Sequence, residues 1–214
     1  MRESGVGRVL VASLHQAIGE HLPTRLGFYE SWMSPDDLRA GTIGLAPLNA
    51  VFSFLRQEGE AYDRVVTRAG EYAAEWTVAS MTPVSRRLLG TWPRFVRRRL
   101  VLGRACGLVR LSFEGNRASW RIRKGIARVD IRQSVFCTVR QPVAHPLCGY
   151  YAAMVRRMLQ LFDLDADVTI ESCRGMGADG CRLRQTVAVP AEASSEEHSA
   201  QLSASGAEAA AVDA

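Results

Sequence analysis

The sequence predicts an α+β fold, in which a helical N-terminal half packs on an antiparallel sheet of four to five strands. Residues 1–106 carry apolar side chains at helical spacing, whereas from Gly107 onward apolar and polar side chains alternate as they do in strands. One further helical stripe, at 148–162, interrupts the alternating part. We therefore predict a single domain over residues 1–189, with a helical part at 1–106 and a sheet-and-helix part at 107–189.

Prolines and glycines divide the helical half into separate helices. An apolar stripe from Val9 to Ile18 predicts the first of them. The segment Ser34-Pro35-Asp36-Asp37 combines a capping serine, a proline at the first helical position and acids in the first turn, as is typical of a helix start. The expected helices are 6–20, one that starts at 34–37, one that starts at Pro47, 60–79, one at Pro83, and one from Pro93 to about Gly107.

The second half consists of short alternating runs that turn residues separate. Glu114-Gly115-Asn116 and Lys124-Gly125 have the composition of turns between paired strands. The expected strands are 108–113, 117–123, 127–132, 167–173 and 181–187, and the helix at 148–162 comes between the third and the fourth. This pattern predicts an antiparallel sheet with helices over one face.

The end of the chain differs from the rest in composition. No lysine or arginine follows Arg184, whereas five acidic residues do, namely Glu192, Glu196, Glu197, Glu208 and Asp213. Residues 190–214 consist largely of Ala, Ser and Glu and have little apolar surface to bury. We predict a disordered acidic tail at 190–214, which leaves the folded part strongly basic.

The arginines allow several interpretations. One positive face could be formed by residues 97–99 on a predicted helix together with four arginines on predicted strands, namely Arg121, Arg123, Arg128 and Arg132. A solvated face, a docking surface for an acidic protein or an anionic membrane, and recognition of ligand carboxylates all remain open. We expect no nucleic-acid partner, because aromatic side chains such as Trp120 alternate toward the core and do not stand among the arginines.

We expect a cytoplasmic protein. No apolar run approaches the length that crosses a bilayer, and the segment Met-Arg-Glu-Ser-Gly at the start lacks the pattern of a signal peptide. In a reducing compartment the cysteines are expected to be thiols or metal ligands and not disulfides.

The run Gly175-Met176-Gly177-Ala178-Asp179-Gly180 matches the spacing of a dinucleotide-binding loop. That loop binds phosphate at the start of a helix, but the pattern that follows here predicts a strand. We interpret the run as a turn between two strands. The sequence then shows no site for nicotinamide, flavin or an iron–sulfur cluster.

Several of these residues resemble the vinyl-4-reductase domain family. The similarity lies in Cys148-Gly149-Tyr150-Tyr151-Ala152 at a helix start, followed by Glu171, Cys173 and Gly180-Cys181, and it extends over about residues 117–189. This family is related in fold to the small TRAPP vesicle-tethering subunits and to the sensor domains of phenol-responsive activators. The resemblance therefore implies a TRAPP-like fold and, with it, a homodimer.

The helical half is similar to family members that act in bacteriochlorophyll synthesis. This implies a chlorophyllide-type Mg-tetrapyrrole as substrate and a place in photosynthesis, peripheral to the photosynthetic membrane. Since no redox-cofactor site is visible, we expect a carrier that presents the pigment to a vinyl reductase or another pigment-synthesis enzyme. A genuine vinyl reductase and a dimeric assembly module are the alternatives, and a sensory role is not expected.

The candidate pigment contacts follow from the same resemblance. His21 and His145, at helix ends, are candidate ligands of the pigment's magnesium, and Tyr72, Trp76 and Phe136 are candidate lining residues of an apolar pocket. One or two of the arginines could recognise the propionate groups of the pigment.

Zinc-binding relatives of the sensor type use a cysteine at the start of the last helix, followed by Glu-x-x-Cys-x7-Cys on two strands. Cys148, Cys173 and Cys181 match that pattern, but Glu171 lies two residues before Cys173 and not three. An offset of two places both side chains on one face of a regular strand, so Glu171 could be the fourth ligand of a structural zinc ion. The alternative is that these cysteines are small buried residues of the core.

Overall fold

The computed structural model describes residues 6–33 and 44–187. The predicted helix start at 34–37 and the predicted tail at 190–214 lie outside these residues. Within them, no helix is both long and apolar enough to span a bilayer.

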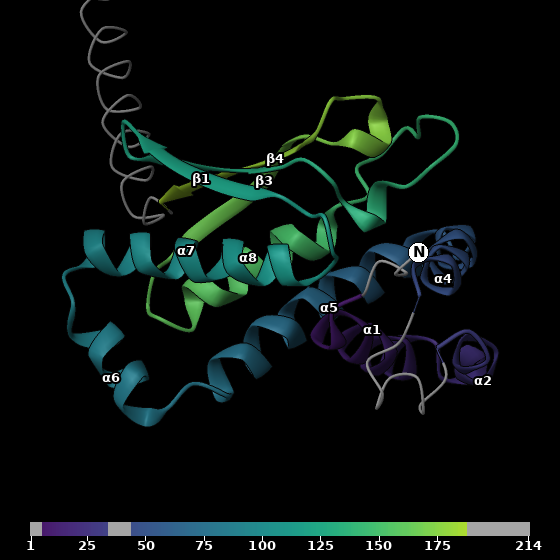
Figure 1. Ribbon diagram of the computed structural model, residues 1–214, viewed down its shortest axis with the longest axis horizontal. Helices are drawn as coiled ribbons and strands as arrows, with labels where there is room; N and C mark the ends of the chain where they lie inside the picture. Colours follow the sequence, from purple (N-terminus) through teal and green to yellow (C-terminus); the bar gives the residue numbers. More distant parts are fainter. Residues whose placement is uncertain (1–5, 34–43, 188–214) are drawn as a thin grey trace, which may run out of the picture.

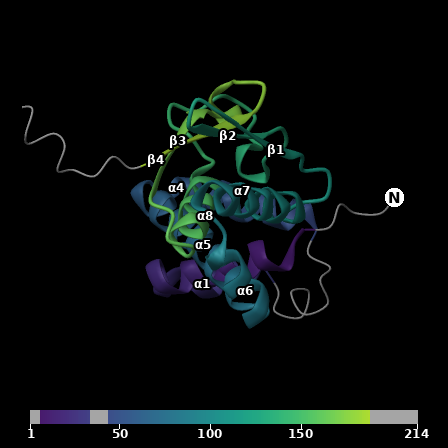
Figure 2. The same cartoon turned by 90° about the vertical axis from the view of Figure 1, so that its left-hand side faces the viewer.

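The fold is α+β, as predicted, with three layers (Figures 1 and 2). A twisted antiparallel sheet forms one layer, α7 and α8 cover one of its faces, and α5 and α1 lie beneath those two helices. The helices are α1 (Arg8–His21), α2 (Leu26–Glu30), α4 (Leu45–Gln57), α5 (Glu60–Ala79), α6 (Pro83–Thr91), α7 (Arg94–Leu111) and α8 (Gly149–Gln160). Short 3-10 turns lie at η1 (Pro23–Arg25), η2 (Val135–Cys137) and η3 (Arg174–Met176).

The sheet of the described residues has four strands in the order β1-β2-β4-β3. They are β1 (Ala118–Arg123), β2 (Ile126–Ile131), β3 (Ala166–Ser172) and β4 (Cys181–Val187). The last two agree with the sequence prediction to within one residue at each end. Residues 175–180 connect β3 to β4, so the interpretation of this glycine-rich run as a turn is confirmed.

The predicted strand at 108–113 is wrong. Helix α7 continues past Gly107 to Leu111, because Val101, Ala105 and Val109 carry one buried stripe through the glycine at helical spacing. Strand β1 pairs instead with β2 across Lys124-Gly125. Both turn residues have positive φ, 49° at Lys124 and 76° at Gly125, as a two-residue hairpin turn requires.

The two central helices cross at a glycine. A Cβ atom added to Gly70 of α5 would overlap the carbonyl oxygen of Tyr150 in α8 and would lie 3.0 Å from the amide nitrogen of Met154. The backbones can therefore approach this closely only because residue 70 has no side chain. The contact places the buried rings of Tyr150 and Tyr151 between the helices and the loop around Phe136.

The outer face of the sheet carries most of its charge. Arg121, Arg128 and Arg184 lie in register across β1, β2 and β4. Two carboxylates neutralise part of this charge: Asp130 pairs with Arg182 at 2.6 Å, and Glu171 pairs with Arg128 at 3.0 Å. The strand arginines thus do share one face, and they carry a solvated ion-pair network there.

We expect Gly70→Ala to destabilise the fold by about 3 kcal/mol, because the new methyl group must push two helix backbones apart. Urea unfolding followed by circular dichroism would measure the loss. The matched control is Gly90→Ala in α6, where an added Cβ meets nothing within 4 Å. That variant should be neutral or gain up to about 1 kcal/mol from helix propensity. Equal stability of the two variants would contradict the role assigned to Gly70.

Candidate metal centre

Four buried cysteines converge beside the sheet. The Sγ atoms of Cys137, Cys148, Cys173 and Cys181 all lie within 4.8 Å of one another, and we call this group the four-cysteine cluster. The Cys137 sulfur lies 3.4 Å from that of Cys173 and 3.4 Å from that of Cys181. A zinc ion with Zn–S bonds of about 2.3 Å separates its four sulfurs by roughly 3.8 Å, so the cluster has the dimensions of such a site.

Each cysteine comes from a different element. Cys137 ends the turn η2, and Cys148 is the N-cap of α8. Cys173 directly follows β3, and Cys181 begins β4. The cluster therefore joins the loop at 132–148, the start of α8 and both ends of the β3–β4 turn.

Glu171 does not belong to this group. The pairing of β3 with β4 shifts between Ile170, opposite Leu183, and Ser172, opposite Arg182, so Glu171 lies in a β-bulge. The extra residue breaks the alternation, and Cys173 faces the core while Glu171 stays on the outer face of the sheet. There its carboxylate binds Arg128, which holds the pKa of Glu171 below its ordinary value.

Cys137 is the residue that the sequence reasoning missed. Cys137 takes the position of fourth metal ligand that the sequence analysis assigned to Glu171. It lies in a 3-10 turn of a loop, outside the motif that contains the other three cysteines. The available signal was the cysteine distribution itself, since four of the five cysteines lie between residues 137 and 181.

Backbone amides point at two of the sulfurs. The amide of Leu147 donates to the Cys173 sulfur at 3.3 Å, and the amide of Arg174 donates to the Cys181 sulfur at 3.4 Å. Such donors stabilise negative charge on sulfur, as the outer shell of a thiolate–metal site does. Both contacts would favour the thiolate over the thiol at these two cysteines.

The four thiols change one another's acidity. Hydrogen bonding with Cys137, and then with Cys148 and Cys181, lowers the pKa of Cys173 well below its ordinary value. Contact with Cys137 raises the pKa of Cys148. Cys106, which lies apart in α7, behaves as a simple buried thiol: burial raises its pKa to about 11.

The helical layer reaches the cluster through Tyr62. Its hydroxyl donates to the carbonyl oxygen of Leu147 at 2.8 Å, next to Cys148 in the chain, and Tyr62 itself is buried. Burial raises the pKa of Tyr62 well above its ordinary value, so the hydroxyl stays a donor. This bond ties α5 to the residue that precedes the α8 cap.

The residues expected to bind a pigment do not form one pocket. Tyr72 and Trp76 stack on each other on α5, with ring centroids 5.4 Å apart, and the Tyr72 hydroxyl donates to Glu20 at 2.6 Å on an exposed surface. His21, the last residue of α1, follows Glu20 and is half-buried.

Phe136 and His145 lie toward the other end of α5. Phe136 is fully buried against Phe52 and Tyr150, with ring centroids at 4.5 and 4.9 Å, whereas His145 is exposed. Tyr62, which marks this end of α5, precedes Tyr72 by ten residues, a helical rise of roughly 15 Å. The aromatic residues of the predicted set therefore line two separate places.

Compared by sequence, the chain matches no protein-family model and no curated protein. Compared by structure, it is similar to H-NOX proteins of Shewanella oneidensis. A crystal structure in the Fe(II)NO ligation state is 14% identical over 86% of this chain and 99% of that chain, with a TM-score of 0.59. An NMR structure in the Fe(II)CO ligation state is 15% identical over 86% and 98%, with a TM-score of 0.54. The phenol-responsive sensory domain of the transcription activator PoxR, with phenol, is 14% identical over 66% of this chain and 73% of that chain, with a TM-score of 0.49.

These comparisons overturn the assignment made from the short motif. The fold is similar to that of H-NOX domains and not to that of a TRAPP-like vinyl-4-reductase domain, so that family assignment is wrong. The functions that depended on it are wrong as well: a role in bacteriochlorophyll synthesis and photosynthesis, and carriage of a chlorophyllide for vinyl reduction. At 14–15% identity the H-NOX similarity establishes the fold alone.

The residues of this chain do not fit the gas-binding iron of those neighbours. An iron that binds NO or CO keeps a coordination position open, whereas four cysteines would saturate a tetrahedral ion. None of the three histidines in the described part of the chain is buried, and His15 pairs with Glu30 at 2.9 Å. The rings of Phe52, Phe136 and Tyr150 pack against one another, with centroids 4.5 and 4.9 Å apart, and fill this part of the interior.

We expect Tyr62→Phe to cost roughly 1–3 kcal/mol of stability, because it leaves the buried Leu147 carbonyl without its donor. Tyr72→Phe is the matched control, since it removes a hydroxyl whose partner, Glu20, is exposed, and it should cost about 0.5 kcal/mol. Urea denaturation of both variants measures the difference. Equal losses would show that the Tyr62 bond does not anchor the loop before α8.

Proposed function

We propose that this chain is a small-molecule-binding domain whose C-terminal half is assembled around a structural zinc ion held by Cys137, Cys148, Cys173 and Cys181. The observation that carries the proposal is the convergence of four buried sulfurs within 4.8 Å. All four ligands come from the protein, so the site is closed in the manner of structural zinc and not of catalytic zinc.

The donor set favours zinc. Four thiolates in a tetrahedral arrangement suit Zn²⁺ or iron among the common metals, and zinc brings no redox chemistry into a buried core. A divalent ion would also compensate thiolates that repel one another when packed this closely. The two amide donors, from Leu147 and Arg174, add to that compensation.

The role of the ion is mechanical. The loop at 132–148 contains no regular structure beyond η2, and apart from the cysteines two hydrogen bonds hold its far end: Val143 to Gly175 at 2.8 Å, and Tyr62 to Leu147. Zinc would fasten this loop to α8 and to the β3–β4 turn at one point. The free energy of metal binding would then become stability of the fold.

Binding of a small molecule is the part of the proposal that the fold similarity supports. The H-NOX structures of the same fold hold Fe(II) with NO or CO. Because the residues of this chain do not fit such an iron site, we assign it an organic ligand. A homodimer and peripheral association with a membrane remain predictions.

The purified protein should contain about one zinc ion per chain, measured by inductively coupled plasma mass spectrometry. Removal of the ion with a chelator should lower the free energy of unfolding by about 4 kcal/mol, the linkage value for a ligand present at a thousand times its dissociation constant. Cys137→Ala should lose most of the zinc, because three thiolates bind the ion less tightly than four.

Two variants serve as controls. Cys106→Ala removes an equally buried cysteine outside the cluster, and Glu171→Gln changes the residue on the outer face of the sheet. Both should keep the full zinc content. Iron in place of zinc, disulfides between the four cysteines, or zinc that Cys137→Ala does not affect would contradict the proposed centre.

A further inference from the structure

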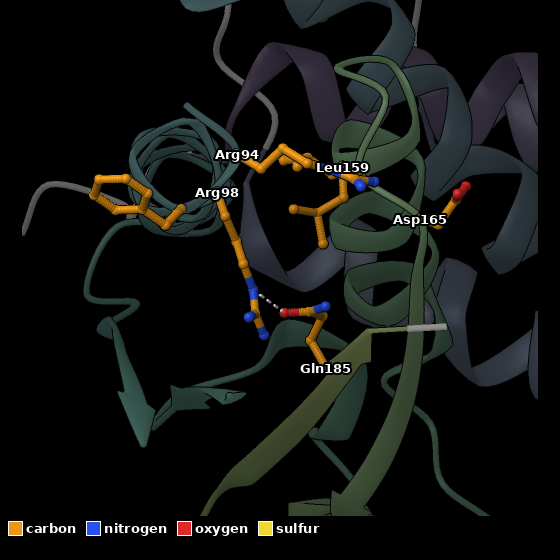
Figure 3. A pocket seen from close by; sticks show the side chains of 7 residues that line it. Arg94, Arg98, Leu159, Asp165 and Gln185 are labelled. Carbon is orange, nitrogen blue, oxygen red and sulfur yellow. Dashed lines mark hydrogen bonds between the residues drawn. The ribbon is translucent and has the colours of Figure 1, made fainter. Parts of the chain in front are cut away.

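A pocket opens between α7, α8 and β4. None of the site residues named so far lines it. Its volume is about 290 Å³, and its lining comprises Arg94, Phe95, Arg98, Leu159, Leu164, Asp165 and Gln185. Figure 3 shows Arg98 reaching from α7 across to Gln185 on β4, with the Leu159 side chain facing the same space. The carboxylate of Asp165 lies on the far side of α8 from Arg98.

In the described part of the chain, no acidic side chain neutralises the positive charge of Arg98. Its Nε donates to the Gln185 side-chain oxygen at 2.7 Å, and Nη2 donates to the Gly125 carbonyl at 2.8 Å. Both acceptors are neutral, and among the described residues Arg98 forms no ion pair. Two of the five N–H groups of the guanidinium are used in this way, which leaves Nη1 free to donate.

The surroundings leave this charge partly desolvated, which strengthens its attraction for an anion. Arg98 is half-buried, and burial lowers its pKa from the ordinary value, although an arginine remains charged at neutral pH. Gln185 is only 2% exposed and donates through its own amide to the Thr186 carbonyl, so its oxygen is fixed toward Arg98. The pocket also adjoins the first turn of α7, where the helix dipole favours a negative ligand.

The remaining walls are apolar. Leu159 and Leu164 are buried side chains that form the floor, and Phe95, 68% exposed, stands at the rim. A volume of about 290 Å³ is at the lower end for pockets that bind small molecules. An inorganic anion would leave these apolar walls unused, and a neutral hydrocarbon would leave the guanidinium unpaired.

We propose that this pocket binds a small organic carboxylate with an aromatic or branched apolar body. The carboxylate pairs with Arg98 through Nη1, and the body lies on Leu159 and Leu164 beneath Phe95. This assignment rests on the proposed small-molecule-binding function and names its ligand class and its site. It does not depend on the metal, because no lining residue belongs to the four-cysteine cluster.

The test is isothermal titration of the full-length, metal-analysed protein with benzoate. Benzoate should bind with a dissociation constant in the millimolar range or below. Benzyl alcohol has a similar shape and no charge, and its dissociation constant should be at least about tenfold higher. Arg98→Gln should weaken benzoate by roughly 10- to 100-fold, the worth of a hydrogen bond to a charged group. Inorganic phosphate should not compete.

Matched variants separate the site from general effects. Arg99→Gln makes the same change of charge on the next, exposed residue of α7 and should leave benzoate affinity unchanged within about twofold. Phe95→Ala, at the exposed rim, cannot disturb the core and should weaken benzoate but not zinc binding. All three variants should keep the zinc content of the parent protein.

Three results would overturn the proposal. Zinc-loaded protein could bind no benzoate, or it could bind benzyl alcohol as tightly as benzoate. The third is that Arg98→Gln and Arg99→Gln weaken benzoate binding equally. Benzoate binding by protein that proves to lack zinc would uphold the pocket and overturn the metal centre. The two proposals can therefore fail separately.

Discussion

The close crossing of α5 and α8 at Gly70 is the constraint on which the other parts of the structure depend. With the backbones in contact there, α8 lies directly between the helical layer and the sheet. Its first turn then carries Cys148 into the four-cysteine cluster, and Leu159, near its other end, forms the floor of the pocket. One helix thus connects the proposed metal site with the proposed ligand site, and α5 fixes the position of both.

The sequence predicted the regular elements of the second half well and the irregular ones poorly. The helix at 148–162 and the strand at 181–187 carry uninterrupted stripes, and the structure has both. Residues 108–113 fit a strand and a helix equally well over so short a run, and only their packing in α7 decides between the two. The β-bulge at Glu171 leaves no mark in the amino-acid pattern, so an offset of two residues could not reveal which side chain faces the core.

The short motif that suggested a pigment-binding family has a packing explanation. Gly149 faces Val66, since a Cβ there would lie 3.3 Å from that side chain, and the rings of Tyr150 and Tyr151 fill the core. Such residues are required wherever a helix enters a tight space beneath a sheet. These residues indicate close packing and do not identify a ligand. The ligand has to be inferred from a charged group that has no counter-ion in the described part of the fold, such as the guanidinium of Arg98.

The wide spacing of the four cysteines along the chain also bears on biosynthesis. All of α8 and β3 lie between Cys137 and Cys173, and the last cysteine begins β4, the strand that sits between β2 and β3. Contacts over such separations form late, because a long loop must close first. A nascent chain that still lacks β4 would expose β2 as an unpaired edge and would hold an incomplete set of thiolates. The ribosome must therefore release nearly the whole domain before the sheet can close and a metal ion can be captured.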